Sequence, residues 1–471
     1  MMQPRLAVLC LIFSVAWLAS CEKQAPPPPK AEPPKAAAPV DEALKRLTAE
    51  VYIYAYPLVL TDVTRAVDTA GLPPDTFRHN ARLPDATSTD VSNPNADFLY
   101  SQAWLDLSKG PVVLSVPDMR GRYYLVAVLG AWTNVVASLS KRTTDANGGR
   151  FAIVGPKWKG KLPGGVSEVQ SPTDLAWLFA RVQVKGEADA KAATRLQSQF
   201  NLKPLGARPK SSGKAARAET AAVDVKTDPR EQVARMDAAT FFTRFAMLLP
   251  GNPPAKDDAP MLEKMKALKV VAGHPFDVGA LEPLAVASID AGMKTALDAI
   301  RTSAKGGTGG DIRNGWAFDN ALGRWGTDYG KRAVAAYIRL GLNAPEDALF
   351  MATRVDADGH PLDGTHDYVL HLDAGKSPTE DGFWSLSLYN DKQHFVASEL
   401  NRYNIGSDSG IKPNADGSVD IYIQSATPGS DRAANWLPAP KGNFNVVLRT
   451  YWPMQDVVDG KWNAPGLRKV K

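Results

Sequence analysis

The sequence predicts a multidomain protein of mixed α and β structure. A β-sandwich domain comes first, a helical domain follows, and an antiparallel sandwich or jelly roll comes last. Two regions rich in β-branched and aromatic runs flank a long region whose apolar residues recur every three or four positions. The chain has 471 residues and a hydrophobic content of 44%, so it is long enough to form several domains with their own cores.

The first 40 residues predict export and a tether rather than a fold. Residues 1–20 are typical of a secretory signal, with Arg5 at the positive start, an apolar middle and small residues before Cys21. The apolar middle is too short to span a bilayer as a permanent helix. Residues 21–40 are rich in Pro and Ala, which favours a semi-rigid polyproline II spacer.

The tetrad Leu18, Ala19, Ser20 and Cys21 resembles a bacterial lipobox. The resemblance implies that Cys21 is the lipid attachment site, that it carries acyl chains such as palmitate, and that it anchors the protein in a membrane. Glu22 follows the cysteine, which by the sorting rule of such lipoproteins implies the periplasmic face of the outer membrane. An ordinary signal peptide with an incidental cysteine is the alternative.

The segment 41–70 predicts a buried helix, because apolar side chains cover nearly its whole circumference. We expect Pro57 to kink or divide it. Segment 71–186 predicts a compact β domain, and its strands are apolar on both faces, as in the middle of a sandwich. The runs that indicate these strands are GPVVLSVP, GRYYLVAVLGAWTNVVASLS, GRFAIVGP and LFARVQVKG.

Segment 187–342 predicts a helical domain, and its stretch near 206–228 is polar enough to be an exposed insertion. Segment 343–471 predicts antiparallel strands joined by short turns, among them DADG at 356–359 and NADG at 414–417. In FWSLSLYN the alternation sets Trp384, Leu386 and Leu388 against Phe383, Ser385, Ser387 and Tyr389.

Several motifs resemble two bacterial domain-of-unknown-function families. NPNADFLYSQAWLDLSKGPVVLSVPDMRGRYYLVAV and SPTDLAWLFARVQV resemble family 1254, whereas DGHPLDGTHDYVLHL, DGFWSLSLYN, NWLPAPKGNFNVVLRTYWP and GKWNAPGLRKV resemble its usual partner, family 1214. The resemblance implies an immunoglobulin-like β-sandwich, an orthogonal helical domain and a C-terminal jelly-roll-like domain. It implies little about activity.

The sequence lacks the residue patterns of several other function classes. No dense basic run is interleaved with aromatics, which argues against nucleic-acid binding. His366 and His371 point to opposite faces of a strand, and DADGHPLDG lacks EF-hand spacing, so we expect no metal and a hairpin turn instead. GSDSG at 406–410 lacks a central serine, and GGTGG at 306–310 lacks the P-loop Lys and Ser. No cofactor is expected.

Two constellations are candidates for ligand binding. The first combines an amide, a carboxylate, a guanidinium and aromatic planes, which suit sugar hydroxyls or a planar organic acid; it comprises Asn95, Asp97, Tyr100, Arg122, Tyr123 and Trp132. The alternative is a turn capped by Asn95 and Asp97, with Arg122 paired to a carboxylate at a domain seam.

The second constellation lies on the polar face of the C-terminal strands. Small serines there would leave room beneath aromatic walls; the set is Ser385, Ser387, Tyr389, Arg402, Tyr403, Asn435, Trp436, Arg449 and Tyr451. The alternative is a solvated outer face beside a rigid loop.

These observations predict a lipid-anchored envelope protein that binds, and in one version processes, a polar small molecule or glycan in an interdomain cleft. Asp97 would be the acid or base, and Arg122 and Arg449 would orient the ligand. The rival hypothesis is a non-catalytic envelope module that engages proteins or cell-wall polymer. The membrane, reached through Cys21, is the expected partner, and homo-oligomerisation is left open.

Overall fold

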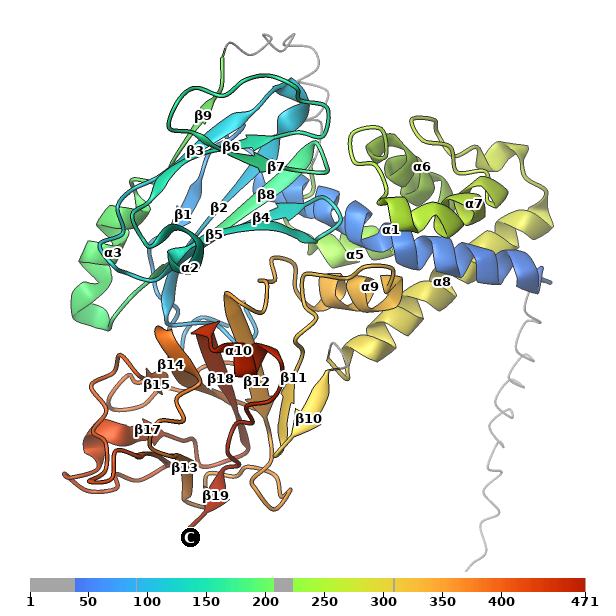
Figure 1. Cartoon of the computed structure of the whole chain (residues 1–471). Coiled ribbons are helices and arrows are strands. Elements are labelled where there is room, and N and C mark those ends of the chain that lie inside the picture. Colours follow the sequence, from blue (N-terminus) through green and yellow to red (C-terminus); the bar gives the residue numbers. More distant parts are fainter. Residues whose placement is uncertain (1–38, 90, 207–222, 308–309, 471) are drawn as a thin grey trace, which may run out of the picture. The chain divides into compact units, whose positions relative to one another are not determined.

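The computed structural model describes residues 39–89, 91–206, 223–307 and 310–470. These residues form a mixed α and β protein with several mainly antiparallel sheets (Figure 1), which confirms the predicted class. The predicted signal peptide, Cys21 and nearly all of the predicted tether lie outside the described residues. Among the described helices, none has both the length and the apolar composition to cross a membrane.

The helix α1 (Glu42–Asp68) begins where the sequence predicts it. Asp41 caps it, because its Oδ1 accepts the backbone N–H groups of Ala43 and Leu44 at 2.8 and 3.1 Å. Nearly every residue from 51 to 63 is buried, which confirms the prediction of a helix enclosed on most sides. Pro57 lies inside α1 without dividing it. The helix packs mainly against α8 and α9.

Two sheets lie in the first strand-rich region (Figure 1), and their side chains share one core. A five-stranded sheet has the order β1 (Arg78–Asn80), β2 (Phe98–Asp106), β8 (Leu175–Gln183), β4 (Tyr124–Gly130) and β5 (Val135–Ser140). A four-stranded sheet has the order β7 (Ser167–Gln170), β6 (Gly149–Val154), β3 (Val112–Val116) and β9 (Asn201–Pro204). Leu105 and Leu178 of the first sheet join Leu114 and Ile153 of the second in one apolar cluster.

The other face of the five-stranded sheet is also covered. Trp104 and Trp177, paired across β2 and β8, stack with ring centroids 4.7 Å apart. Both belong to the apolar cluster that contains α1 and the later helices. These strands are therefore apolar on both faces because each face meets a different partner, as the sequence indicated.

Most helices between the strand-rich regions gather around α1, whereas the first of them, α3 (Ala190–Gln197), packs against β2 and β8. Phe241, Phe242 and Phe245 of α6 are fully buried in the shared helical core. The helices are α3 (Ala190–Gln197), α5 (Pro229–Ala234), α6 (Ala238–Leu248), α7 (Ala259–Ala267), α8 (Pro283–Ala304) and α9 (Tyr329–Ile338), with short helices α2 (Lys141–Thr144) and α10 (Gln455–Val458) elsewhere. Most of the predicted polar insertion lies outside the described residues.

Short strands interrupt the segment that the sequence predicted to be helical. β9 returns to the four-stranded sheet, and β10 (Asp311–Arg313) and β11 (Trp316–Phe318) form a hairpin that joins the C-terminal sheet. Asn314 and Gly315 form its turn with φ of 49° and 79°, the conformation that an Asn-Gly pair favours. Trp316 and Phe318 are buried in the C-terminal core, which fixes the hairpin there.

The C-terminal region also contains two sheets that share a core. The six-stranded sheet has the order β10, β11, β12 (Ala348–Thr353), β18 (Phe444–Pro453), β14 (Thr379–Asn390) and β15 (Asn404–Gly406). The four-stranded sheet has the order β17 (Trp436–Pro438), β16 (Val419–Gln424), β13 (Tyr368–Leu372) and β19 (Arg468–Lys469). Two pairs, β6 with β7 and β16 with β17, are parallel.

The predicted alternation along β14 is confirmed. Trp384, Leu386 and Leu388 belong to the core between the two C-terminal sheets. The predicted DADG and NADG turns are also present, since Gly359 and Gly417 both have φ of 85°. Ser385 and Tyr389 lie on the opposite face of β14, together with side chains of β12, β15 and β18. We call this opposite face the polar face of the six-stranded sheet.

Candidate functional site

The two predicted constellations meet at Asp97. The Asp97 Oδ2 atom accepts hydrogen bonds from Ser385 Oγ at 2.6 Å and Tyr451 OH at 2.9 Å, and Oδ1 accepts one from Asn404 Nδ2 at 2.5 Å. Asp97 lies just before β2, whereas its donors come from β14, β15 and β18. The loop before β2 therefore docks on the polar face. We call these four residues, with Asn95, the Asp97 network.

Asn95 makes hydrogen bonds both within its own loop and to the Asp97 network. Its Oδ1 accepts the backbone N–H of Asp97 at 2.8 Å, and its Nδ2 donates to Tyr451 OH at 2.8 Å. The backbone N–H of Val184 donates to the Asp97 carbonyl at 2.8 Å. The turn-capping alternative and the ligand-site hypothesis thus describe the same residues, because the turn holds the carboxylate against the polar face.

Strand pairing places the donors on one face. Ser385 lies opposite Arg449 of β18 and opposite Gly406 of β15, and Tyr451 lies two residues further along β18. Residues two apart on a strand share a face, so these side chains all point toward Asp97. Gly406 allows β15 to pair closely here, because a Cβ atom at this position would lie 2.0 Å from the Trp384 carbonyl oxygen.

The charges of the site are almost fully buried. Asp97 is 5% exposed and Arg449 is 2% exposed. Burial raises the pKa of Asp97, although Arg449 and the hydrogen bonds from Ser385, Tyr451 and Asn404 oppose that rise. Burial by itself lowers the pKa of Arg449, but Tyr389, Tyr451 and Asp97 together raise it above its ordinary value. Arg449 therefore stays charged inside the protein.

The Arg449 guanidinium group is only partly used by the protein. Nη2 donates to the Asn93 carbonyl at 3.2 Å, and the group lies 5.4 Å from the Phe350 ring centre and 5.6 Å from that of Tyr389. The Tyr389 hydroxyl donates to the Pro94 carbonyl at 2.6 Å. Nε and Nη1 of Arg449 are buried without a hydrogen bond of good geometry to the described residues. The Tyr389 side chain also interacts with Arg449, and Nε and Nη1 keep the capacity to bind a further acceptor.

Two further arginines, which the sequence reasoning missed, lie near Arg449. Arg181 is paired with Tyr100 across β8 and β2, stacks 5.6 Å from that ring centre, and donates from Nη2 to the Gly341 carbonyl at 3.2 Å. Arg339 donates from Nη2 to the Ser92 carbonyl at 2.7 Å. Arg181 could have been recognised, because an arginine inside an otherwise apolar strand is rarely buried without a partner. Arg339 carries no comparable sequence signal.

The Arg339 guanidinium group is influenced by the other two. Part of the Arg339 side chain is exposed, yet the surrounding protein removes enough water to lower its pKa. The like charges of Arg449 and Arg181 lower it further, and Tyr100 and Tyr389 oppose this effect. With Asp97 as the one acidic side chain of the Asp97 network, positive charge is in excess at this place. The arrangement suits a negatively charged ligand.

Arg122 does not join the Asp97 network. Its guanidinium pairs with both carboxylate oxygens of Asp189, and Nη1 also donates to the Gln183 carbonyl at 2.7 Å. The alternative to a ligand site had Arg122 paired with a carboxylate, as it is here. Tyr123 does lie beside the network, because its ring centre is 5.7 Å from that of Tyr451 and its hydroxyl donates to the Asp347 carbonyl. Trp132 instead donates to the Asn252 carbonyl in the helical core.

The remaining candidates of the second constellation organise a loop. Arg402 Nη1 donates to the carbonyls of Ala433 and Trp436 at 3.0 and 2.7 Å. Asn435 bonds both backbone groups of Lys412, and Trp436 Nε1 donates to the Gln424 carbonyl. Arg402, Asn435 and Trp436 therefore hold a rigid surface loop, as the alternative described, and make no hydrogen bond to Asp97.

Among the residues that the structure describes, one group of side chains could hold a metal ion. Ligand atoms of Asp356, Asp358 and His360 lie within 4.8 Å of one another in the DADG turn. Asp356 Oδ1 already accepts the backbone N–H groups of Asp358 and His360, each at 2.9 Å. These bonds are the ones that a capped hairpin turn requires. Asp356 Oδ2 is buried without a hydrogen bond to the described residues.

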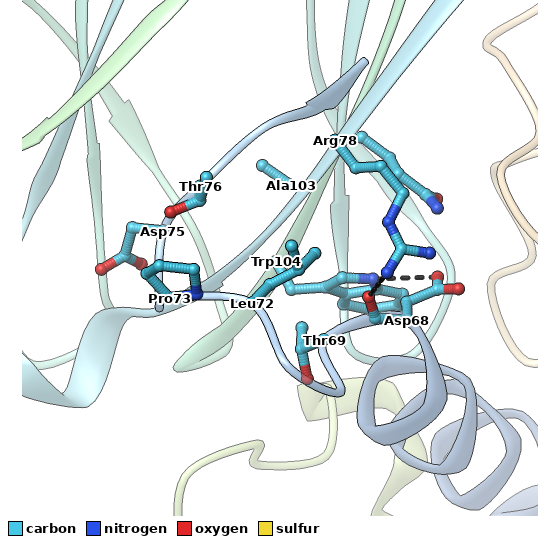
Figure 2. A pocket seen from close by; sticks show the side chains of 10 residues that line it. Asp68, Thr69, Leu72, Pro73, Asp75, Thr76, Arg78, Ala103 and Trp104 are labelled. Carbon is cyan, nitrogen blue, oxygen red and sulfur yellow. Dashed lines mark hydrogen bonds between the residues drawn. The ribbon is translucent and has the colours of Figure 1, made fainter. Parts of the chain in front are cut away.

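A small pocket beside the end of α1 holds at most about one water molecule. Figure 2 shows Asp68 between Trp104 and Arg78: Trp104 Nε1 donates to Asp68 Oδ2 at 3.1 Å, and Arg78 Nη2 donates to the Asp68 carbonyl at 2.7 Å. The cavity volume is about 10 Å³. Burial raises the pKa of Asp68, against the influence of Trp104 and Arg78. The pocket is too small for a substrate.

Comparisons with known proteins place these residues in two families. The family described as Protein of unknown function (DUF1254) matches residues 74–204, and the family described as Protein of unknown function (DUF1214) matches residues 347–455. Asp97 falls in the first match, and Ser385, Asn404 and Tyr451 fall in the second. No curated protein sequence matches the chain.

Two solved structures match 91% of this chain each. The VPA0106 protein from Vibrio parahaemolyticus is 24% identical, with a TM-score of 0.67 over 91% of this chain and 100% of that chain. A putative uncharacterized protein from Burkholderia cenocepacia is 14% identical, with a TM-score of 0.44 over 91% of this chain and 95% of that one. The first likeness concerns the fold alone. The chain thus carries a DUF1254 region followed by a DUF1214 region, in the order that the sequence predicted.

Proposed function

We propose that this protein is a lipid-anchored protein of the cell envelope that binds a negatively charged polar small molecule between its DUF1254 and DUF1214 regions. The observation that carries the proposal is the Asp97 network, in which a carboxylate from one region accepts three side-chain hydrogen bonds from the other. Beside it, Arg449 keeps buried N–H groups that the described residues do not use. Unused, charged donors are what an anionic ligand requires.

The ligand would be oriented by arginines and aromatic rings together. Arg449 and Arg181 each lie over aromatic rings, and Arg339 adds a third positive charge that is partly exposed to solvent. A planar organic acid fits this combination, because its carboxylate can pair with a guanidinium fork while its plane stacks on a ring. Any processing of the ligand would depend on Asp97, whose raised pKa favours retention of a proton.

Binding can be tested by calorimetry with a panel of organic acids and neutral glycans. We expect Arg339→Gln to weaken binding of an organic acid at least about tenfold, since one charge-assisted hydrogen bond contributes on the order of 1.5–3 kcal/mol. Arg324→Gln is the matched control, because Arg324 is also exposed but pairs with Glu346. Equal binding by the wild type, Arg339→Gln and Arg181→Gln would place the ligand elsewhere.

The anchor can be tested separately by fractionation. The proposal rests on the lipobox-like tetrad that ends at Cys21 and on the Pro-rich spacer after it. We expect Cys21→Ser to leave the membrane fraction for the soluble fraction. Unchanged processing and fractionation of this variant would exclude acylation of Cys21 as the anchor, and with it the envelope localisation.

We also infer the finer fold assignments from the resemblance. The paired sheets of the DUF1254 region are proposed to be an immunoglobulin-like sandwich, and those of the DUF1214 region a jelly-roll-like sandwich. The shared core of each sheet pair supports this inference.

A further inference from the structure

A basic groove lies between the turn that joins β3 to β4 and the helix α3. Its volume is about 420 Å³, within the usual range for small-molecule sites. The turn contributes Arg120 and Arg122, α3 and the residues after it contribute Arg195 and Gln199, and Lys185 lies just beyond the end of β8. No acidic side chain lines the described walls. We call this feature the basic groove.

Half of the positive charge in the basic groove is already neutralised. Arg122 pairs with Asp189, and Lys185 lies 3.7 Å from Asp408. The side chains of Arg120 and Arg195, by contrast, form no ion pair with any acid in the part of the chain that the structure describes. Two cations therefore face the groove uncompensated, and the bidentate pair of Arg122 with Asp189 keeps the Arg122 side chain in place.

Local structure holds the two free arginines on opposite walls. Arg120 and Gly121 have φ of 53° and 72°, and the N–H of Arg122 donates to the Met119 carbonyl at 3.0 Å, so the turn is tight. On the other wall Ala192, Arg195, Leu196 and Gln199 follow helical spacing and share one face. Met119 is fully buried, and Leu196 packs against the core of the sheet pair. The groove thus has an anchored base and two charged walls.

We propose that the basic groove binds a phosphate group. A phosphate dianion carries three acceptor oxygens and about two negative charges, which match the two uncompensated guanidinium groups on opposite walls. The Gln199 amide nitrogen donates one hydrogen to the Arg195 carbonyl at 3.0 Å, and its second hydrogen is a further donor at the rim. The phosphate could belong to a soluble phosphorylated molecule or to a lipid headgroup, since both present the same chemistry.

The soluble source is tested with glycerol phosphate by calorimetry on the full chain. We expect Arg120→Gln and Arg195→Gln each to weaken binding at least tenfold. Arg150→Gln is the matched control, because Arg150 is exposed on β6 and does not line the groove. Equal affinity in all variants, or equal competition by inorganic sulfate, would overturn the proposal for this source.

The lipid source is tested with phosphatidylcholine vesicles that contain phosphatidic acid. Cosedimentation is measured in the Cys21→Ser background, so that an acyl anchor does not dominate. A tenfold loss in the two groove variants, with Arg150→Gln unchanged, would assign the groove to a headgroup phosphate. If neither glycerol phosphate nor these vesicles distinguish the groove variants from Arg150→Gln, the proposal is wrong. Arg339→Gln should bind both probes normally, which separates this groove from the proposed ligand site.

Discussion

Two buried aspartates of this molecule have nearly the same surroundings but different partners. Asp97 and Asp258 are 5% and 2% exposed, and each accepts hydrogen bonds from tyrosine hydroxyls. Each also has a buried arginine nearby that stacks on aromatic rings, Arg449 for Asp97 and Arg332 for Asp258. Composition and burial alone would not tell the two sites apart.

The Asp258 site is explained by the helices that it joins. Its carboxylate accepts the N–H of Ala255 at 3.0 Å, and it accepts the hydroxyls of Tyr54 in α1 and Tyr329 in α9, both at 2.9 Å. Arg332 lies between three rings at 5.1 to 5.2 Å and fills the space that remains. Burial lowers the pKa of Arg332 more than its neighbours raise it. The positive charge is therefore disfavoured there.

The Asp97 site has the opposite balance. The neighbours of Arg449 raise its pKa in spite of complete burial, so the protein stabilises this charge rather than tolerating it. The donors to Asp97 come from three strands of the other family region, not from nearby helices. Both arginines leave two buried nitrogens without a hydrogen bond to the described residues, Nε and Nη1 in Arg449 and Nε and Nη2 in Arg332. The comparison therefore teaches that a charge which its surroundings favour is a better indicator of a ligand site than burial or unused N–H groups.

Removal of the carboxylate should give the largest difference in stability between the two sites. Asp97→Ala should lower the free energy of unfolding by about 4–5 kcal/mol, because it leaves Arg449 buried without its counter-charge and three donors without an acceptor. Asp258→Ala should cost about 2–3 kcal/mol, since it removes hydrogen bonds but no favoured ion pair. Urea denaturation followed by circular dichroism measures both. Equal losses would remove the distinction between the two sites.

Removal of the arginines should give the next largest contrast. Arg449→Met is expected to cost about 3 kcal/mol, because Asp97 then stays buried without a cation. Arg332→Met should cost about 1 kcal/mol, since a flexible apolar side chain can occupy the same space among the rings. The same denaturation measurement applies. A larger loss for Arg332→Met would show that its charge, not Arg449's, is the favoured one.

Deletion of single hydroxyl groups should have a smaller effect. Tyr451→Phe leaves Asn95 Nδ2 and Asp97 Oδ2 short of a partner in a buried place, and we expect a loss of about 1–2 kcal/mol. Tyr329→Phe should cost about 0.5 kcal/mol, because the Tyr329 bond is only partly buried and water can replace it. Thermal unfolding of the paired variants provides the check. No difference between them would mean that the Asp97 network is open to water.

The smallest expected effect is the change in stability with pH that depends on Asp97. The folded protein holds the Asp97 proton more tightly than the unfolded chain, because its pKa is raised above 3.8. The folded state therefore binds more protons, and stability falls as the pH rises above that value, by at most about 1.4 kcal/mol per pH unit. Comparison of the wild type with Asp97→Asn across this interval isolates the contribution, which the variant should lack. A wild-type stability that increases relative to that of Asp97→Asn as the pH rises would contradict the raised pKa.

Much of the fold followed from local patterns. The period of two along β14 and the apolar circumference of α1 directly report which faces are buried, so both elements were predictable. The hairpin at Asn314 and Gly315 was missed although its Asn-Gly turn is a strong signal, because its strands are only three residues long and lie among helices.

The site was predictable in its parts but not in its assembly. Asn95, Asp97, Ser385 and Tyr451 were recognised as polar residues on loops and strand faces, yet the docking of the two regions brings together positions separated by about 290 to 350 residues. Arg122 was grouped with Asp97 in the first constellation, but its side chain pairs with Asp189, a contact that the sequence pattern does not reveal. Asn404 was missed since β15 is only three residues long.

The hairpin of β10 and β11 has a consequence for attempts to dissect the chain. A fragment that begins at residue 343 would lose both strands and leave the backbone N–H and C=O groups along one side of β12 without partners. It would also open the holes that Trp316 and Phe318 fill, which are 1% and 8% exposed in the intact protein. Such a fragment would tend to recruit strands from its own copies and form aggregates, so the DUF1214 region is best expressed together with the hairpin that precedes it.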